Sequence, residues 1–384
     1  MDRDRKGPVL AEPVTTTQTL SIPQAIALAR TRYDAGALDQ AQEICRRILG
    51  AMPDRAGTVV MLASIAFRKG EDRAGETYLA RAIDLTRAAV QRMPQDVGTR
   101  ASLVNLLLAH GRVSEAEALM PGLPIPLNPI RATDEEFAAR RQAGIGKNLP
   151  SMMICTVPKS ASESIWNKLA EGLGLAQCYL SLGLFPDCCL VPARVAEAAP
   201  GGIVAKDHIA PTAHNLRTLG QAGIDRVIVH HRDPRQAALS WVHFARDDIN
   251  QRLMAPLWRK IVPPAGVLNR DLGAQIDWCI ENYLLLLIGF LADWRTVDAD
   301  PDRPVSVLFL SFEQFRTEPA RYFERALEFY RVPPERFAAE AEAEVVHLRK
   351  GQTDEWRSVF TEAQRARAWE LIPDDMAEAF GWRP

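Results

Sequence analysis

The sequence lacks the marks of a secreted or membrane-bound chain. Its first twenty residues contain no apolar stretch of the kind found in a signal peptide. The longest later apolar run, "YLLLLIGFLADW" (283–294), is shorter than the ~20 residues that span a bilayer, so we expect a core helix and no integral membrane segment. The six cysteines form no CxxC pair and no cysteine–histidine zinc spacing, which predicts buried or free thiols. We therefore expect a cytoplasmic protein.

Strong charge of either sign is also missing. The 46 basic and 48 acidic residues leave a net charge of −2, and apolar residues make up 47% of the chain. This balance is typical of a globular protein and does not indicate a nucleic-acid partner. Any anion site must be a local cluster of lysine and arginine.

Several catalytic motifs are absent as well. The chain contains no GxxxxGK[ST] phosphate loop, no HExxH or paired-carboxylate metal motif and no GxSxG elbow. The first absence argues against an NTPase or a nucleotide or sugar kinase, and the others against a metal-dependent enzyme and a serine hydrolase.

At 384 residues the chain predicts two domains. Residues 1–20 are polar and aperiodic, which predicts a disordered tail. In residues 21–122, Gly36, Gly70 and Gly111 recur at spacings of 34 and 41, between helical patterns rich in alanine. This pattern resembles the tetratricopeptide repeat, with one helix longer by two turns; a generic array of helical hairpins is the alternative. Such repeats imply a protein partner or self-association.

The residue pattern of the remaining chain changes twice. The proline-rich run "PGLPIPLNPI" (121–130) breaks the helical pattern and one short helix follows, which predicts a linker at residues 123–148. From residue 149 to 384, apolar strands alternate with helices. This alternation predicts an α/β domain with a parallel sheet covered by helices on both faces, and ligands at the carboxyl ends of its strands.

The first candidate motif is "PKSASES", between an apolar strand and a helix. Backbone N–H groups and the helix dipole at such a point bind phosphate, and Lys159 adds a positive charge. Ser160, Ser162 and Ser164 add hydroxyl donors. The alternative is a plain helix cap with a solvated lysine.

Two further motifs are cationic. "HHRDPRQAALSW" places Arg232 at the end of a strand and Ser240 in the following helix, where both could bind phosphate; a salt-bridged Arg232–Asp233 turn is the alternative. "HLRKGQTDEW" places Arg349, Lys350 and Gly351 together in a late loop that could close over an anion, although a surface basic run is the usual explanation.

Together, PKSxSxS, RDPRxxxxSW and RKGxxxxW resemble the sulfotransferases that use 3′-phosphoadenosine 5′-phosphosulfate (PAPS). The resemblance covers about residues 150–384 and includes the strand–glutamate segment "VLFLSFEQF". It implies that Lys159, Ser160, Ala161, Ser162, Glu163 and Ser164 hold the 5′-phosphosulfate. It also implies that Arg232 and Ser240 bind the 3′-phosphate, that Arg349, Lys350 and Gly351 close on it, and that no metal takes part.

Three residues depart from the family pattern. Ala161 stands where glycine is usual, Glu163 where a hydroxyl residue is usual, and Asp354 where glycine is common. A carboxylate near a phosphosulfate is electrostatically unfavourable, so Glu163 puts the affinity for PAPS in question.

The segment "VAKDHIAPTAHN" supplies the candidate catalytic base. Alternate strand residues share a face, which puts Lys206 and His208 together. The segment resembles the KTH of the family, which implies His208 as general base, with Lys206 and Lys159 stabilising charge. His214, in the next helix, and His230 and His231, within a strand, are rivals for which structural roles are favoured.

The acceptor is predicted by analogy alone. A hydroxyl of a saccharide or glycoconjugate is favoured over a phenol or steroid, because nothing in the sequence marks a large apolar pocket. Trp241, Phe244 and Trp258 could stack on a sugar ring or belong to the core. The alternative function is a non-catalytic nucleotide-binding protein whose repeats recruit a partner.

Overall fold

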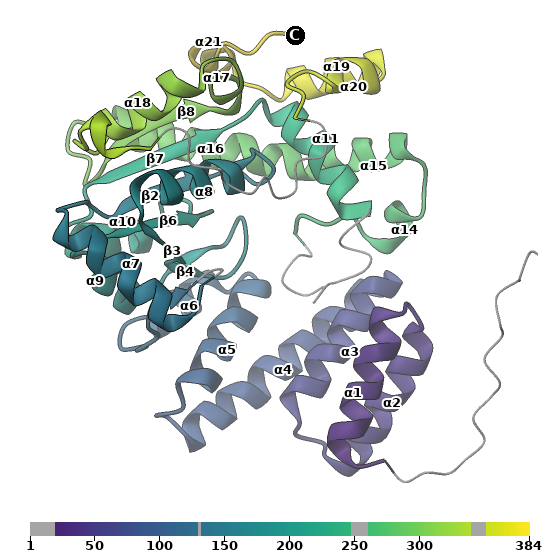
Figure 1. Ribbon diagram of the computed structural model, residues 1–384. Coiled ribbons are helices and arrows are strands. Elements are labelled where there is room, and N and C mark those ends of the chain that lie inside the picture. Colours follow the sequence, from purple (N-terminus) through teal and green to yellow (C-terminus); the bar gives the residue numbers. More distant parts are fainter. Residues whose placement is uncertain (1–19, 130–131, 247–259, 339–350) are drawn as a thin grey trace, which may run out of the picture.

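The computed structural model describes residues 20–129, 132–246, 260–338 and 351–384. Its N-terminal part is helical throughout (Figure 1). The helices are α1 (Ile22–Asp34), α2 (Leu38–Ala51), α3 (Ala56–Lys69), α4 (Asp72–Arg92), α5 (Val97–Ala109) and α6 (Val113–Leu119). They pack as successive pairs, α1 with α2, α3 with α4 and α5 with α6.

Each helical pair turns at a glycine that the spacing singled out. Gly36, Gly70 and Gly111 have φ angles of 76°, 75° and 81°, in the left-handed region where glycine avoids a Cβ clash. Helix α4 has 21 residues and α2 has 14, and the difference of seven matches the two additional turns predicted for this repeat.

The linker region packs onto the C-terminal part of the chain. Its elements are β1 (Asn128–Pro129) and α7 (Asp134–Gly146). A capping box fixes the start of α7: the Glu136 N–H donates to the Thr133 hydroxyl at 3.2 Å, and the Thr133 N–H donates to the Glu136 carboxylate at 2.8 Å. Phe137 lies in the core of the α/β domain, so α7 is structurally part of that domain.

A six-stranded sheet, ordered β1-β3-β6-β2-β7-β8, organises the C-terminal part. Its long strands are β2 (Met152–Thr156), β3 (Ala176–Tyr179), β6 (Ile203–Asp207), β7 (Arg226–His231) and β8 (Ser306–Ser311). Neighbouring pairs among these five are parallel, which confirms the predicted fold class. Two short strands, β4 (Ser181–Leu182) and β5 (Cys189–Leu190), pair antiparallel beside the sheet.

Helices cover both faces of the sheet. On β2, Met152 and Ile154 pack with Trp166, whereas Met153 and Cys155 point into the opposite apolar layer. The helices are α8 (Ser162–Leu173), α9 (Pro192–Ala198), α10 (Ala213–Gln221), α11 (Pro234–Phe244), α14 (Ala265–Leu268), α15 (Leu272–Trp278), the π-helix η2 (Cys279–Tyr283), α16 (Leu284–Ala299), α17 (Phe312–Thr317), α18 (Pro319–Phe329), the 3-10 turn η3 (Pro334–Arg336), α19 (Trp356–Val359), α20 (Glu362–Glu370) and α21 (Asp374–Phe380).

The long apolar run lies in a longer helix than the sequence suggested. Residues Leu272–Ala299 form 28 continuous helical residues, long and apolar enough to cross a bilayer by length and composition. The expected length was wrong because the less apolar residues before Tyr283 continue the helix. Leu284, Leu287, Leu291 and Trp294 are buried in the core of the α/β domain, where the sequence placed them.

The strand order creates a crevice beside β2. From β2 the chain crosses to β3 and returns to β6 on one side of β2, then places β7 and β8 on the other side. Ligands in such sheets bind outside the carboxyl ends of the strands at this reversal point. The loops after β2, β6 and β7 meet there, and they carry Lys159, His208 and Arg232.

Candidate functional site

The loop after β2 makes a tight turn before α8. β2 is buried along its whole length, and α8 begins at Ser162 as predicted. Lys159 and Ala161 have φ angles of 66° and 65°, both left-handed. This conformation costs an alanine about 1 kcal/mol, which explains why glycine suits position 161. Ala161 keeps the loop geometry at that cost.

A buried series of hydrogen bonds, from Tyr322 through His230 to Ser160, supports the loop. The His230 Nε2 lies 2.7 Å from the Ser160 carbonyl oxygen, and the Tyr322 hydroxyl lies 3.0 Å from the His230 Nδ1. Because a carbonyl only accepts, Nε2 carries the proton and Nδ1 accepts from Tyr322. Burial lowers the pKa of His230 to about 4, so the ring is neutral at pH 7.

The serines of the loop differ in orientation. The Ser160 hydroxyl donates to the Val157 carbonyl at 2.8 Å, and its side chain is fully buried. It does not line the cavity described below, whereas Ser162 and Ser164 do. In this structure the Ser160 side chain closes the turn, and a ligand would meet the other two hydroxyls.

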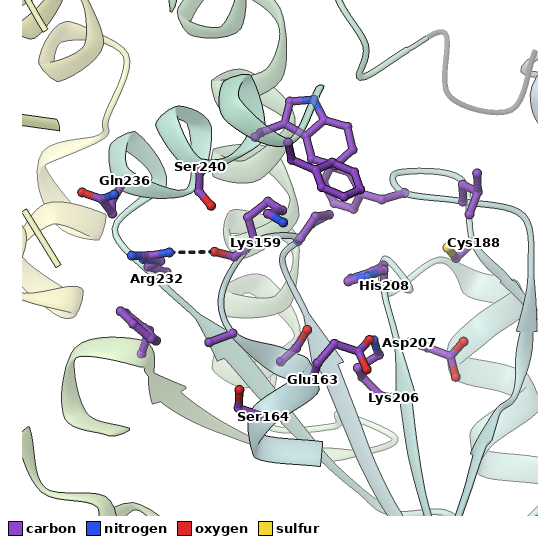
Figure 2. Close-up of a pocket in the computed structure, with 18 of the residues that line it drawn as sticks. Lys159, Glu163, Ser164, Cys188, Lys206, Asp207, His208, Arg232, Gln236 and Ser240 are labelled. Carbon is purple, nitrogen blue, oxygen red and sulfur yellow. Dashed lines mark hydrogen bonds and ion pairs between the residues drawn. The ribbon is translucent and has the colours of Figure 1, made fainter. Parts of the chain in front are cut away.

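Arg232 joins the three motifs. Its guanidinium donates to the Lys159 carbonyl at 3.0 Å and also to the Gln352 carbonyl, and it lies 4.1 Å above the Phe312 ring (Figure 2). Gln352 follows Gly351, so the late loop reaches the same point as the first two motifs. Arg349 and Lys350 lie outside the described residues.

Helix α11 presents two polar side chains to the same space. Ser240 and Gln236 are one helical turn apart and both line the cavity. Asp233 is paired with Arg235: its carboxylate accepts from the Arg235 guanidinium at 3.0 and 2.8 Å. The salt bridge shown at this turn is thus formed by Arg235, while Arg232 donates to the two carbonyls.

Arg235 links the second motif to the third. Its guanidinium lies 3.9 Å from the centroid of the Trp356 ring, and both side chains are fully buried. The Gln236 side chain also accepts from the Trp356 N–H at 3.1 Å. Trp356, five residues after Gly351, thus anchors the late loop to α11.

Lys206 is buried and paired with Glu163. Its ammonium bonds the Glu163 carboxylate and lies 5.1 Å from the Trp166 ring and 5.3 Å from the Tyr179 ring. Glu163 therefore neutralises the charge of Lys206, one of the two lysines expected to stabilise charge. Both residues line the cavity.

His208 follows β6 and faces the cavity with one ring nitrogen engaged. Its Nδ1 lies 2.6 Å from the Thr156 carbonyl oxygen and 3.1 Å from the Thr156 hydroxyl. Since the carbonyl only accepts, Nδ1 holds the proton and Nε2 keeps its lone pair. Burial, and then the charge of Lys206, lower the pKa of His208 to about 4. The imidazole is neutral at pH 7 and able to accept a proton.

The rival histidines have other partners. The His214 Nε2 lies 2.9 Å from the Leu190 carbonyl oxygen, and His230 supports the loop as described. The ring of His231 packs among Phe309, Phe380 and Trp382 on the other face of β7. Of the four histidines weighed from the sequence, His208 alone lines the cavity.

A cavity of about 520 Å³ unites these groups. Near His208 its wall is largely apolar and includes Leu184, Phe185, Trp241 and Phe244. Trp241 is 1% exposed and stacks on Tyr283, so it belongs mainly to the core, whereas the partly exposed Phe244 lies 4.1 Å from the Lys159 ammonium. Trp258 lies outside the described residues.

Sequence reasoning missed part of this lining. The missed residues are Tyr179, Ser181, Arg194, Asp207, Gln236, Phe312, Gln352 and Glu355. The four-residue spacing to Ser240 on one helix could have indicated Gln236. The others come together only through the tertiary fold.

Asp207 shapes the cavity from the face of β6 opposite to the one that carries Lys206. Its carboxylate accepts from the N–H groups of Leu180 at 2.9 Å and Ser181 at 3.2 Å. Burial raises its pKa to about 6, against the opposing effect of these hydrogen bonds. Asp207 thereby fixes the start of the 180–191 wall that faces His208.

Comparison with known proteins gives distant likenesses. No family model and no curated protein matches the sequence. Among solved structures, mouse sulfotransferase SULT7A1 complexed with PAP matches with a TM-score of 0.43 and 14% identity, covering 66% of this chain and 97% of that chain. A mutant of Thermobaculum terrenum O-GlcNAc transferase matches with a TM-score of 0.21 and 13% identity, covering 82% and 73%. Both likenesses are too distant to carry a functional argument.

Proposed function

We propose that the chain transfers the sulfuryl group of PAPS to a hydroxyl of an acceptor, with His208 as general base. One observation carries the proposal. The loop after β2, Arg232 and Gln352 are joined by hydrogen bonds at one cavity, and His208 lies in the same cavity with its Nε2 lone pair available.

The residues around the loop fit a nucleotide with phosphates at both ends of its ribose. The left-handed backbone conformation of Lys159 and Ala161 makes a tight turn just before α8, a geometry in which backbone N–H groups can bind an anion. Ser162 and Ser164 add hydroxyl groups to the cavity lining. Arg232 and Ser240, which follow the neighbouring strand β7, add a second set of polar side chains to the cavity lining. Arg349 and Lys350 remain predicted to complete it.

PAPS would supply an activated sulfuryl group with adenosine 3′,5′-diphosphate (PAP) as leaving group. His208 would accept the proton of the attacking hydroxyl at Nε2 while the new O–S bond forms and the S–O bond to phosphate breaks. Lys159 and Lys206 would offset the charge that develops on the leaving phosphate. The Thr156 carbonyl keeps the His208 ring in the tautomer that this step needs.

The cavity also bears on the acceptor. Leu184, Phe185 and Phe244 give the space near His208 an apolar lining, which the sequence did not reveal. The reason for disfavouring apolar acceptors therefore does not hold. We propose an acceptor whose hydroxyl sits on a ring with an apolar face; a sugar ring remains the first candidate and a phenol is the alternative outcome.

The second candidate function is a non-catalytic nucleotide-binding protein. The Glu163–Lys206 ion pair and the carboxylate of Glu355 in the lining favour it, because acids oppose a highly charged donor. PAP binding without transfer to any acceptor would support this alternative.

The deciding experiment compares wild type with His208→Ala. We expect the variant to lose transfer of ³⁵S from labelled PAPS by about 10²–10⁴-fold, the usual contribution of a general base. Its Kd for PAP, measured by calorimetry, should stay within about twofold of wild type because His208 touches the acceptor side.

The control is His110→Ala, a histidine of the helical part that pairs with Glu76 at 3.6 Å and does not line the cavity. It should leave both quantities unchanged. Undiminished turnover by His208→Ala would remove the assigned base. Acceptors are sought by labelling small molecules and glycoconjugates from cell extracts.

A further inference from the structure

The wall of the cavity opposite α11 is a short hairpin. β4 and β5 pair antiparallel, and the turn between them contributes Gly183, Leu184, Phe185 and Cys188 to the lining. The Phe185 ring meets the His208 ring edge-on, with centroids 6.3 Å apart. This hairpin therefore bounds the side where an acceptor hydroxyl must approach His208.

Helix α5 of the helical part holds the same hairpin from outside. The Gly183 N–H donates to the side-chain oxygen of Asn105 at 3.2 Å. The Gly183 φ is 87°, and a Cβ built there would lie 2.7 Å from Leu108 Cδ1 and 2.7 Å from the Asp187 carbonyl oxygen. The backbone at position 183 is thus clamped between α5 and its own turn.

The contact continues through β5. Cys189 and Val191 are buried in the same apolar cluster as Leu103, Leu107 and Met120 of the helical part. An ion pair between Lys260 and Asp187 closes the outer edge of the turn. In Figure 1, α5 and α6 lie directly below β4. The helical part and the cavity wall share one apolar core.

We propose that the helical part completes the acceptor pocket, and that Asn105 is a positioning residue that sets how acceptors bind. Asn105 fixes the Gly183 N–H and Leu108 blocks outward movement of the turn, so together they keep Phe185 against His208. This inference rests on the proposed function and extends it, because it gives the repeats a role at the site besides recruiting a partner.

The test uses the full chain with Asn105→Ala, Asn105→Asp and, as control, Ser102→Ala. Ser102 lies on the same helix, and its hydroxyl bonds the Gly98 carbonyl of that helix. The acceptor probes are 4-nitrophenyl β-glucoside and 4-nitrophenol. We measure acceptor KM and kcat, the Kd for PAP, and hydrogen exchange of residues 181–187.

For Asn105→Ala we expect at least fivefold faster exchange at 181–187 and about a tenfold higher acceptor KM, with the Kd for PAP within twofold of wild type. Asn105→Asp should restore both values, because its carboxylate still accepts from Gly183. Ser102→Ala should resemble wild type.

Unchanged exchange, an unchanged acceptor KM, or a parallel loss of PAP affinity in Asn105→Ala would each overturn the proposal. A wild-type chain that binds PAP but sulfates neither probe counts against the proposed transfer to these acceptors. In that case the proposed role of Asn105 is judged on the hydrogen exchange of residues 181–187 alone. Exchange in Asn105→Ala that is as slow as in wild type overturns the role, and faster exchange supports it.

Discussion

At the scale of single residues, the environment of His208 determines what it can do. The Thr156 carbonyl fixes the proton on Nδ1, and burial keeps the ring neutral with a pKa of about 4. The resemblance suggested a histidine base here, but neither the tautomer nor the pKa could be read from the sequence. Both depend on β2 lying beside β6 in the folded sheet.

This pKa predicts an unusual pH profile. A base works only when unprotonated, so activity is lost as the pH falls through its pKa. We expect kcat/KM, which reports the free enzyme, to stay on its plateau down to about pH 5 and to fall only below that. A bound anionic donor favours the protonated ring, so the fall in kcat should come at higher pH.

Initial rates between pH 4 and pH 8 measure both profiles, with circular dichroism to show that the chain stays folded. A fall of kcat/KM centred near pH 6.5, the ordinary value for histidine, would contradict the burial assigned to His208.

Glu163 is the second residue whose role depends on its surroundings. Its carboxylate pairs with Lys206 in the cavity lining, where under the proposed function it would repel the anionic donor. We expect Glu163→Gln to lower the Kd for PAP about three- to tenfold, because the like charge is removed and Lys206 is released. Calorimetry at two salt concentrations measures this.

Glu171→Gln is the matched control, since Glu171 is also on α8 but pairs with Arg140 at 2.8 Å on the surface. It should bind PAP as wild type does. Weaker binding by Glu163→Gln would instead mean that the carboxylate supports the loop.

At the scale of elements, the loop after β2 depends on the strand beside it. Tyr322 on α18 orients His230 on β7, which in turn holds the Ser160 carbonyl. We expect Tyr322→Phe to weaken PAP binding about fivefold, because the loop loses its support while the aromatic packing remains. Titration with PAP measures the change in affinity, and thermal unfolding of the variant measures the change in stability separately.

Tyr330→Phe provides the comparison. The Tyr330 hydroxyl is also buried, but it bonds Met153 at the opposite end of β2, at 2.7 Å from its N–H. It should lower the unfolding temperature comparably and leave PAP binding unchanged. Equal PAP affinity in both variants would show that the His230 chain does not position the loop.

The elements that could be predicted are those with a strong period or a strong cap. The strands β2, β6 and β7 were evident as apolar runs, and the helices after them began near the expected residues. β3, with four residues, and β4 and β5, with two each, are too short to show alternation. The strand expected to continue to Phe315 ends at Ser311, because the Ser311 side chain caps α17 by accepting from the Gln314 N–H at 3.0 Å.

At the scale of the whole molecule, the sequence located the cationic turns but not what surrounds them. Arg232 and Lys159 were placed at one edge of the sheet because parallel strands end together. The apolar lining from Phe185 and the support from Asn105 come from segments 80 residues apart, which no local pattern connects. The repeats were expected to bind a protein partner or to self-associate, and the structure adds that they share a core with the cavity wall.

The central claim is that the turns carrying Lys159, Arg232 and Gly351 form one site for a nucleotide with phosphates on both sides of its ribose. Calorimetric titration of the full chain with PAP tests it most directly, using wild type, Arg232→Ala and the control Arg226→Ala. Arg226 begins the same strand and pairs with Asp225 at 3.1 Å, away from the cavity. We predict saturable one-to-one binding to wild type and to Arg226→Ala, and at least about tenfold weaker binding to Arg232→Ala, because a charge-assisted contact is lost. A wild-type chain that fails to bind PAP, or an Arg232→Ala variant that binds it as tightly as wild type, would contradict the account.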